Sequence, residues 1–249
     1  MYFFLSPSTN KYFNIIFFTM KKIDEKCYVL KITGYLFNDD MLHELYELAE
    51  YIKSLSEKGK TFIIVVGGGS YLRSVLTFLR KYSYASEYDL DMLGIYFSRL
   101  NAYILLQLLK PSVVESIPTS VEEALTLYFK FRKNIVMGGV SPGFSTNAVS
   151  AYIASRLSSP LINMTRVGAV YDKDPEKFSD AKKINVIHID KLIEIIEKYK
   201  ESAGYYPLFD KSSLNIIKEY NIPTCIIAPS RTSLYNYIEK GECGTTIII

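Results

Sequence analysis

The chain has 249 residues, of which 49% are hydrophobic and 22% are charged, and its formal net charge is +3. This composition is ordinary for a globular protein with a substantial core, and its length fits one large α/β domain or two smaller ones. The charge is small and the basic residues are scattered rather than gathered in a stripe, so composition does not indicate nucleic-acid binding.

The first residues, 1–19, are rich in aromatic side chains but are interrupted by polar residues and by Pro7. They lack the basic start of a signal peptide and are too short and broken to span a bilayer, so we expect no membrane association. We expect Met20 to be the natural start, or the leader to be poorly ordered, with residues 20–249 as the folded domain. A small membrane- or partner-binding tail is the alternative.

Apolar periodicity predicts strands that alternate with helices along the chain. The expected strands are KCYVLKITGYLF, TFIIVV, NIVMGG, PLINMTR and PTCIIA, and YNYIEKG and GTTIII close the chain. The expected helices lie at 38–58, from about 71, and at 90–109, 146–158, 189–202 and 214–221. This alternation predicts an α/β fold, a three-layer αβα sandwich with a mostly parallel central sheet.

The cysteines Cys27, Cys225 and Cys243 are odd in number and lack the spacing of a metal site. We interpret them as reduced thiols of an intracellular, cytoplasmic protein. His43 and His188 fall on separate expected elements without a nearby cysteine or acidic cluster, so we assign no metal-binding residues.

Unusual residues gather where four expected strands end, and ligands of parallel sheets bind at this edge. These stretches are KITG at 31–34, GGGS at 67–70, GGVSPGFST at 138–146 and TRVGAVYDKDP at 165–175. Bare glycine backbone lets N–H groups approach an anion, and a following helix adds its N-terminal dipole. Both glycine stretches therefore suit phosphate, and a tight turn is the alternative interpretation of the triplet taken alone.

Several side chains beside these glycines have both a functional and a structural interpretation. Arg73 is placed to donate paired hydrogen bonds to phosphate oxygens. Lys31 is placed to stabilise the negative charge of a phosphoryl group during its transfer. Asp174, before a proline, suits ribose hydroxyls or a plain turn, and Asp91 suits a ligand or a helix cap. Arg99 and Asn101, which lie among apolar neighbours in one expected helix, are structural anchors or line an acceptor pocket.

At these residues the sequence resembles the amino acid kinase superfamily and, within it, the archaeal-type uridylate (UMP) kinases. The matching stretches include LKITGYLF, VVGGGSYLR, LDMLGIYFSRLNAYI, GGVSPGFSTNAVSAYIA and VGAVYDKDP, in the family order. The resemblance implies a single domain, Mg²⁺-dependent transfer of the ATP γ-phosphate to UMP in pyrimidine nucleotide biosynthesis, and a homohexamer.

The resemblance also implies roles position by position, with Lys31 and Arg73 catalytic. Residues implied to bind ATP are Lys31, Ile32, Thr33, Gly34, Tyr35, Gly69, Arg73, Thr165, Arg166, Tyr171 and Asp174. Residues implied to bind UMP are Gly68, Asp91, Val140, Ser141, Pro142, Gly143, Phe144, Ser145 and Thr146.

The chain departs from the family at a few of these positions. Tyr35 stands where many members have a second lysine, and Asn147 stands where an acidic residue is common. The family pattern NVDGVY reads RVGAVY here, which introduces Arg166.

Three hypotheses follow: an active UMP kinase, a catalytically weakened or inactive nucleotide-binding paralogue, and a kinase of the same fold for another small acid or phosphate.

Overall fold

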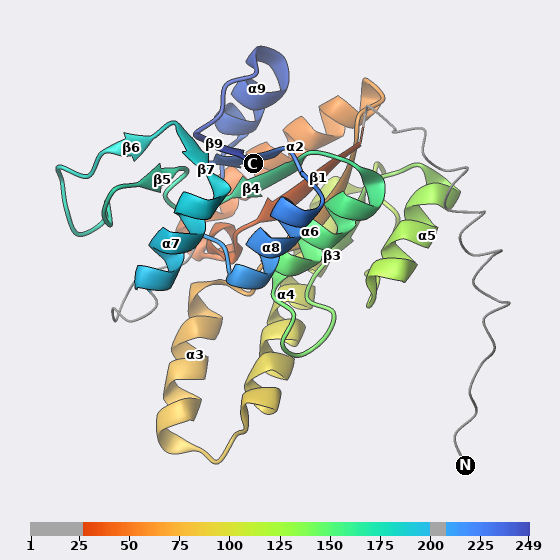
Figure 1. The fold of residues 1–249 in the computed structure, drawn as a ribbon. Coiled ribbons are helices and arrows are strands. Elements are labelled where there is room, and N and C mark those ends of the chain that lie inside the picture. Colours follow the sequence, from red (N-terminus) through yellow and green to blue (C-terminus); the bar gives the residue numbers. More distant parts are fainter. Residues whose placement is uncertain (1–26, 200–207) are drawn as a thin grey trace, which may run out of the picture.

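The computed structural model describes residues 27–199 and 208–249, so the expectation for the leader at 1–19 lies outside the described residues. Within them the central layer is a seven-stranded sheet with the strand order β3-β2-β1-β4-β8-β9-β7 (Figure 1). The strands are β1 (Cys27–Ile32), β2 (Thr61–Val66), β3 (Ile135–Met137), β4 (Leu161–Met164), β7 (Val186–His188), β8 (Thr224–Ile227) and β9 (Thr245–Ile248). Hydrogen-bonded neighbours run parallel, except that β8 and β9 are antiparallel, so the expected fold class is confirmed.

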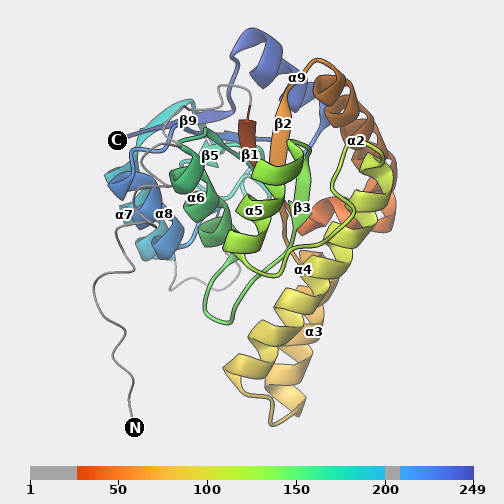
Figure 2. The same ribbon diagram turned by 90° about the vertical axis from the view of Figure 1, so that its right-hand side faces the viewer.

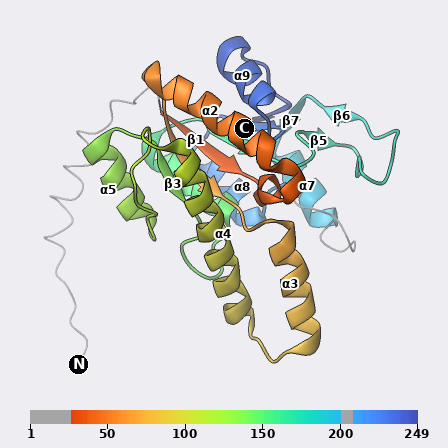
Figure 3. The ribbon, with the colours of Figure 1, turned by 180° about the vertical axis from the view of Figure 1, so that it is seen from behind.

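Helices cover both faces of this sheet. They are α2 (Leu42–Glu57), α3 (Gly69–Tyr82), α4 (Glu87–Leu109), α5 (Val121–Phe131), α6 (Thr146–Leu157), α7 (Ile189–Tyr199), α8 (Lys211–Glu219) and α9 (Arg231–Lys240), with short 3-10 turns η2 (Gly34–Phe37) and η3 (Asp39–Met41). Figure 1 shows α6 and α8 in front of the sheet, and Figure 3 shows α2 and α4 on the opposite face. Each face has its own hydrophobic cluster, one built with α5, α6, α7 and α8 and the other with α2, α4 and α9.

The sequence of β1 and β2 explains why both are interior strands of the sheet, each with a neighbour on either side. Every residue of β2 from Phe62 to Val66 is 0% exposed, as expected for an apolar strand that is covered on both faces. On β1, Leu30 and Ile32 belong to one hydrophobic cluster and Val29 to the other, because successive side chains point to opposite faces. Lys31 therefore projects on the same side as Val29, toward the α6 face.

The structure adds elements that the sequence analysis did not predict. These are α5, the strand β7, and a two-stranded hairpin of β5 (Val170–Tyr171) and β6 (Lys183–Ile184). Helix α3 also begins at Gly69, two residues before the expected start at Tyr71. A signal for α5 was present, because Ser120 and Glu123 have the spacing of a capping box and the Ser120 hydroxyl accepts from the Glu123 N–H at 3.1 Å.

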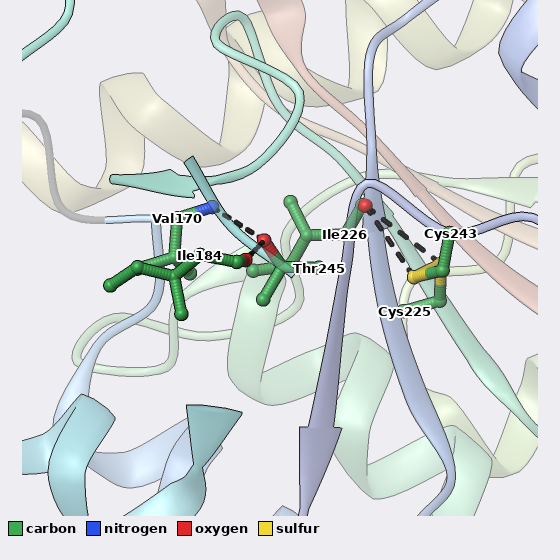
Figure 4. Close-up of a disulfide and its surroundings, with 6 residues drawn as sticks. All are labelled: Val170, Ile184, Cys225, Ile226, Cys243 and Thr245. Atoms are coloured by element: carbon green, nitrogen blue, oxygen red, sulfur yellow. Dashed lines mark hydrogen bonds between the residues drawn. A yellow bond between two sulfur atoms is a disulfide. The ribbon is translucent and has the colours of Figure 1, made fainter. Parts of the chain in front are cut away.

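The interpretation of all three cysteines as reduced thiols is wrong for two of them. Cys225 on β8 and Cys243 just before β9 form a disulfide with a Cα–Cα distance of 5.9 Å (Figure 4). The antiparallel pairing of β8 with β9 brings these residues together, and their separation of 18 residues does not reveal it. Cys27 is buried and is not part of this disulfide.

Helices α3 and α4 form a hairpin that projects away from the sheet (Figure 2). By length and composition alone, α4 is apolar enough to cross a membrane. In the fold its inner end packs on the sheet through Ala102, Leu105 and Leu109, all of which are 0% exposed. The outer part of the hairpin carries exposed aromatic side chains, including Phe78, Tyr82, Tyr88 and Tyr96.

Candidate functional site

The four strand ends singled out from the sequence lie side by side. Strands β3, β2, β1 and β4 are consecutive in the sheet and parallel, so their carboxyl ends meet at one edge. Parallel α/β sheets bind ligands at this edge. The fold therefore brings the glycine stretches and the turn after β4 into one region.

Glycines allow the first two strand ends to touch. A Cβ added to Gly34 would lie 2.2 Å from the backbone nitrogen of Gly69, and one added to Gly69 would lie 2.8 Å from the Gly34 carbonyl oxygen. Gly69 also has a φ of +94°, which residues with a side chain rarely adopt. A Cβ on Gly68 would lie 2.2 Å from a methyl carbon of Leu72. Within the triplet, Gly69 is therefore required by close backbone approach and by its positive φ, so the stretch is more than a turn.

One helix, α4, anchors both glycine loops. The Asn101 side-chain amide donates to the carbonyl oxygens of Gly67, at 2.9 Å, and Gly68, at 3.2 Å. The Arg99 guanidinium donates to the Gly139 carbonyl at 3.0 Å, and the Ser98 hydroxyl accepts from the Gly139 N–H at 2.8 Å. Of the two interpretations of Arg99 and Asn101, the contacts support the structural anchor.

Asp91 also joins α4 to the second loop. Its carboxylate accepts a hydrogen bond from the backbone N–H of Gly143 at 2.7 Å. The alternative that Asp91 caps the helix is wrong, because α4 begins at Glu87 and is capped by Ser86 in a capping box with Asp89. Hydrogen bonds from the Ser86 hydroxyl and backbone lower the pKa of Asp89. Asp91 therefore lies one turn further along, beside the second loop.

The second loop leads into α6. The Ser145 hydroxyl accepts from the Ala148 N–H at 3.0 Å, so Ser145 is the N-cap of α6, and it also bonds the Asp210 carboxylate. Thr146 begins the helix, and its hydroxyl lies 3.9 Å from where a Cβ of Gly67 would stand. The two glycine loops are therefore neighbours.

A pocket of about 820 Å³, including the solvent at its mouth, opens beside these loops. The predicted ATP-binding residues that line it are Thr33, Tyr35, Arg73, Arg166, Tyr171 and Asp174. Ser70, Ala169, Glu176 and Leu208 also line it but were not among the predicted site residues.

The other predicted ATP-binding residues form the floor and supports of this region rather than its lining. Lys31 is 4% exposed and lies near the end of β1, level with Asn163 of β4. Ile32 and Gly34 are also buried, and Gly69 begins α3. Thr165 is 0% exposed, and its hydroxyl accepts from the Gly168 N–H at 3.2 Å, which stabilises the turn after β4.

The predicted UMP-binding residues are divided between two places. Val140, Ser141 and Phe144 line a separate, open hollow together with Tyr152 and Tyr220. Pro142 lies between them in the loop and is half-buried. Gly68, Asp91, Gly143, Ser145 and Thr146 stand at the junction of the loops with α4 and α6 and do not line that hollow.

Two asparagines near Lys31 were not predicted as site residues. The side-chain amides of Asn163 and Asn147 donate to the same carbonyl oxygen, that of Leu208, at 3.0 Å and 3.4 Å. The side-chain oxygens of both are buried without a hydrogen-bond partner. Buried polar atoms normally have partners, so these two oxygens mark a region suited to a further polar group.

Comparison with known proteins gives concordant findings. The model of the amino acid kinase family matches residues 26–228. A uridylate kinase of Methanobrevibacter smithii is 38% identical over 204 residues, which are 81% of this chain and 89% of that protein. A uridylate kinase of Staphylothermus marinus is 36% identical over 88% of this chain and 97% of its own length. The crystal structure of uridylate kinase from Archaeoglobus fulgidus superposes with a TM-score of 0.76 at 32% identity, over 89% of this chain and 99% of that one.

Proposed function

The chain belongs to the amino acid kinase family, among its uridylate kinases, and from this premise we propose that its strand-end site transfers the γ-phosphoryl group of ATP to UMP. The products are ADP and UDP. The observation that carries this assignment of the site is the meeting of two glycine loops, held by one helix, beside a pocket lined by Arg73 and Arg166. The proposal treats residues 20–249 as one catalytic domain.

ATP occupies the pocket between η2, α3 and the turn after β4. Its phosphates face Arg73, because a guanidinium can donate two parallel hydrogen bonds to phosphate oxygens. They also face the N-terminus of α3, where the helix dipole favours an anion. The adenosine lies toward Tyr171 and Asp174 at the other end of the pocket. Gly34 and Gly69 let the backbone come close enough for both loops to contact the same phosphate chain.

UMP occupies the second loop, from Val140 to Thr146. Gly143, with a φ of +75°, turns the chain so that its N–H meets Asp91, which places a carboxylate where ribose hydroxyls are recognised. The N-terminus of α6 lies at the end of the loop and favours the UMP phosphate. The neighbouring glycine loops then present acceptor and donor phosphates to one another.

Transfer is direct. An oxygen of the UMP phosphate attacks the γ-phosphorus, the bond to the bridging oxygen breaks, and ADP leaves with that electron pair, so no covalent enzyme intermediate forms. Lys31 and Arg73 stabilise the negative charge of the transition state. Because Lys31 is 4% exposed, its charge acts in a medium of low dielectric constant, where it is worth more than in water.

Mg²⁺ would accompany ATP in this proposal and, when bound, would neutralise negative charge on its phosphates. Within the described ranges 27–199 and 208–249, no group of at least three His, Cys, Asp or Glu side chains is arranged to hold a metal. In this proposal the ion would be held mostly by substrate phosphates and water.

We further propose that the enzyme acts in the cytoplasm, in pyrimidine nucleotide biosynthesis, and assembles as a homo-oligomer, a hexamer. The exposed aromatic side chains of the α3–α4 hairpin form the contact between copies in this proposal. The hairpin projects from the body of the molecule (Figure 2), where a second copy can cover its exposed side chains.

A coupled assay of UDP formation tests the proposed function. Purified protein with ATP and Mg²⁺ should form UDP from UMP, and should prefer UMP to CMP, acetylglutamate, carbamate and isopentenyl phosphate. Binding of ATP without UDP formation would identify an inactive nucleotide-binding protein instead. Faster turnover of another acceptor would keep the kinase chemistry and replace the substrate.

A further inference from the structure

Three pocket-lining side chains meet at the mouth of the ATP pocket, and they come from three separate segments. The guanidinium carbon of Arg166, in the turn after β4, lies 5.0 Å from the ring centroid of Tyr35 in η2. The Nε of Arg166 lies 2.8 Å from a carboxylate oxygen of Glu176, in the loop between β5 and β6. All three residues line the pocket that the proposed function assigns to ATP.

The tyrosine positions the arginine. A guanidinium over an aromatic ring is held by attraction to the negative face of the ring, and this contact leaves the edge of the guanidinium available for oxygen ligands. Tyr35 itself is half-buried, which fixes the ring against which Arg166 lies. The contact therefore aims a permanent positive charge along the pocket wall.

Glu176 places a negatively charged oxygen against the Arg166 guanidinium, in the way that a phosphate oxygen would. Within the part of the chain that the structure describes, Glu176 is the one acidic partner of Arg166. The side chains of Arg166 and Glu176 are 51% and 46% exposed, so water screens their attraction and the pair separates easily. Two further ion pairs form within this loop, Lys173 with Asp180 and Lys177 with Asp174.

We propose that Arg166 is a positioning residue for the donor phosphates and that Glu176 is a built-in competitor, which the phosphates of the nucleotide displace. This inference rests on the proposed function, because it assumes that the pocket binds ATP. A phosphate chain carries more negative charge than one carboxylate and accepts two parallel N–H bonds from arginine, so it replaces Glu176 on Arg166. The triphosphate displaces the carboxylate more effectively than the diphosphate, which favours ATP over ADP at the pocket.

The decisive measurement is the dissociation constant of ATP, by calorimetric titration without UMP. Glu176→Gln should tighten ATP binding by about 3-fold, because it removes a competing exposed ion pair. Arg166→Ala should weaken it by about 10-fold, the loss of a charge-assisted contact. In the Arg166→Ala background, Glu176→Gln should have no further effect. A merely structural role of Glu176 predicts the opposite sign, weaker binding.

Matched variants isolate each part of the proposal. Tyr35→Leu should bind ATP about 3-fold more weakly than Tyr35→Phe, because leucine loses the aromatic face and phenylalanine keeps it. Glu47→Gln is the control for Glu176→Gln, since Glu47 pairs with Arg231 at 3.2 Å and neither residue lines the pocket. It should leave ATP binding unchanged.

Kinetic assays then separate the inference from the function on which it rests. The KM for ATP should follow the dissociation constants, while the KM for UMP stays constant. If the unaltered protein forms no UDP, the proposed function fails, yet the ATP titrations still test the competitor. If UDP forms and Glu176→Gln leaves ATP affinity unchanged or lowers it, the inference is overturned.

Discussion

Asn101, in the middle of α4, holds the carbonyl oxygens of both Gly67 and Gly68 with one side-chain amide. It is 8% exposed, so its amide is withdrawn from water together with those carbonyls. The same helix fixes Gly139 through Ser98 and Arg99. The relative positions of the two glycine loops therefore depend on a few polar groups of a mostly apolar helix.

Asn101→Ala should destabilise the protein and loosen the first loop. Removing the amide leaves buried carbonyl oxygens without their donor, which costs about 2 kcal/mol. Thermal unfolding should show a lower Tm, and the KM values for ATP and UMP should rise together. Gln107→Ala is the matched control, because Gln107 is an exposed amide on the same helix. An unchanged Tm for Asn101→Ala would contradict its role as an anchor.

Gly34→Ala should abolish most of the activity. Its Cβ would lie 2.2 Å from the Gly69 nitrogen, so the two loops must separate to accommodate it. We expect kcat to fall by at least about 100-fold, since a misplaced reacting group costs this much. Gly94→Ala is the control, because a Cβ there meets its nearest neighbour at 3.9 Å, and it should preserve activity. Comparable activity of the two variants would show that the close approach is unimportant.

Lys31→Met should lower the activity without lowering the stability of the protein. Lys31 is 4% exposed, and within the described residues its ammonium has no recorded ion pair, so it is a costly charge in the folded protein. The variant should unfold at the same or a higher temperature while kcat falls by at least about 100-fold. Arg73→Ala should lower kcat similarly. An unchanged kcat in both variants would contradict the proposal that Lys31 and Arg73 stabilise the charge of the transition state.

Asp91→Asn should impair UMP binding selectively. The loss of the carboxylate weakens both its bond with Gly143 and its contact with ribose, so we expect the KM for UMP to rise by about 10-fold with the KM for ATP unchanged. Asp89→Asn is the comparison, because Asp89 bonds Ser86 at the start of the same helix. It should affect stability and neither KM. A rise in both KM values for Asp91→Asn would place the residue in the scaffold instead.

Replacing Cys225 and Cys243 together by Ser should lower stability. The disulfide closes a loop with a sequence separation of 18 residues that contains α9, and in the chain-entropy account such a link is worth about 3 kcal/mol. Chemical unfolding with and without reductant measures this. Reductant should destabilise the unaltered protein and leave the double variant unchanged. Equal unfolding midpoints under both conditions would exclude a stabilising role.

The sequence predicted the fold and the strand ends because both have local signals. TFIIVV alone identifies a strand buried on both faces, and a glycine triplet before an apolar-periodic run identifies a loop at a helix start. The sheet order then brings those ends together. Strand β7 and the β5–β6 hairpin lack such signals, since their strands are two or three residues long and are formed by long-range pairing.

The details of the site depend on tertiary contacts that no local pattern contains. The contact of Gly34 with Gly69 joins two loops that are far apart in the sequence. The Asn163 and Asn147 side chains converge on Leu208, from β4 and α6, and this requires the packing of α6 against α8. Glu176 lies in a charged loop whose sequence is typical of a solvated turn. Its ion pair with Arg166 is therefore visible only in the folded structure.

The projecting hairpin has a mechanical consequence. Helix α3 begins in the first glycine loop at Gly69, while α4 contacts that loop through Asn101 and the second loop through Asp91, so both helices of the hairpin hold glycine-loop backbone. A partner that bound the exposed aromatic side chains of the hairpin would also restrain the two glycine loops, because the same two helices contact those loops. Contact between copies at the hairpin, as proposed above, would in this way be coupled to the proposed phosphate-binding loops.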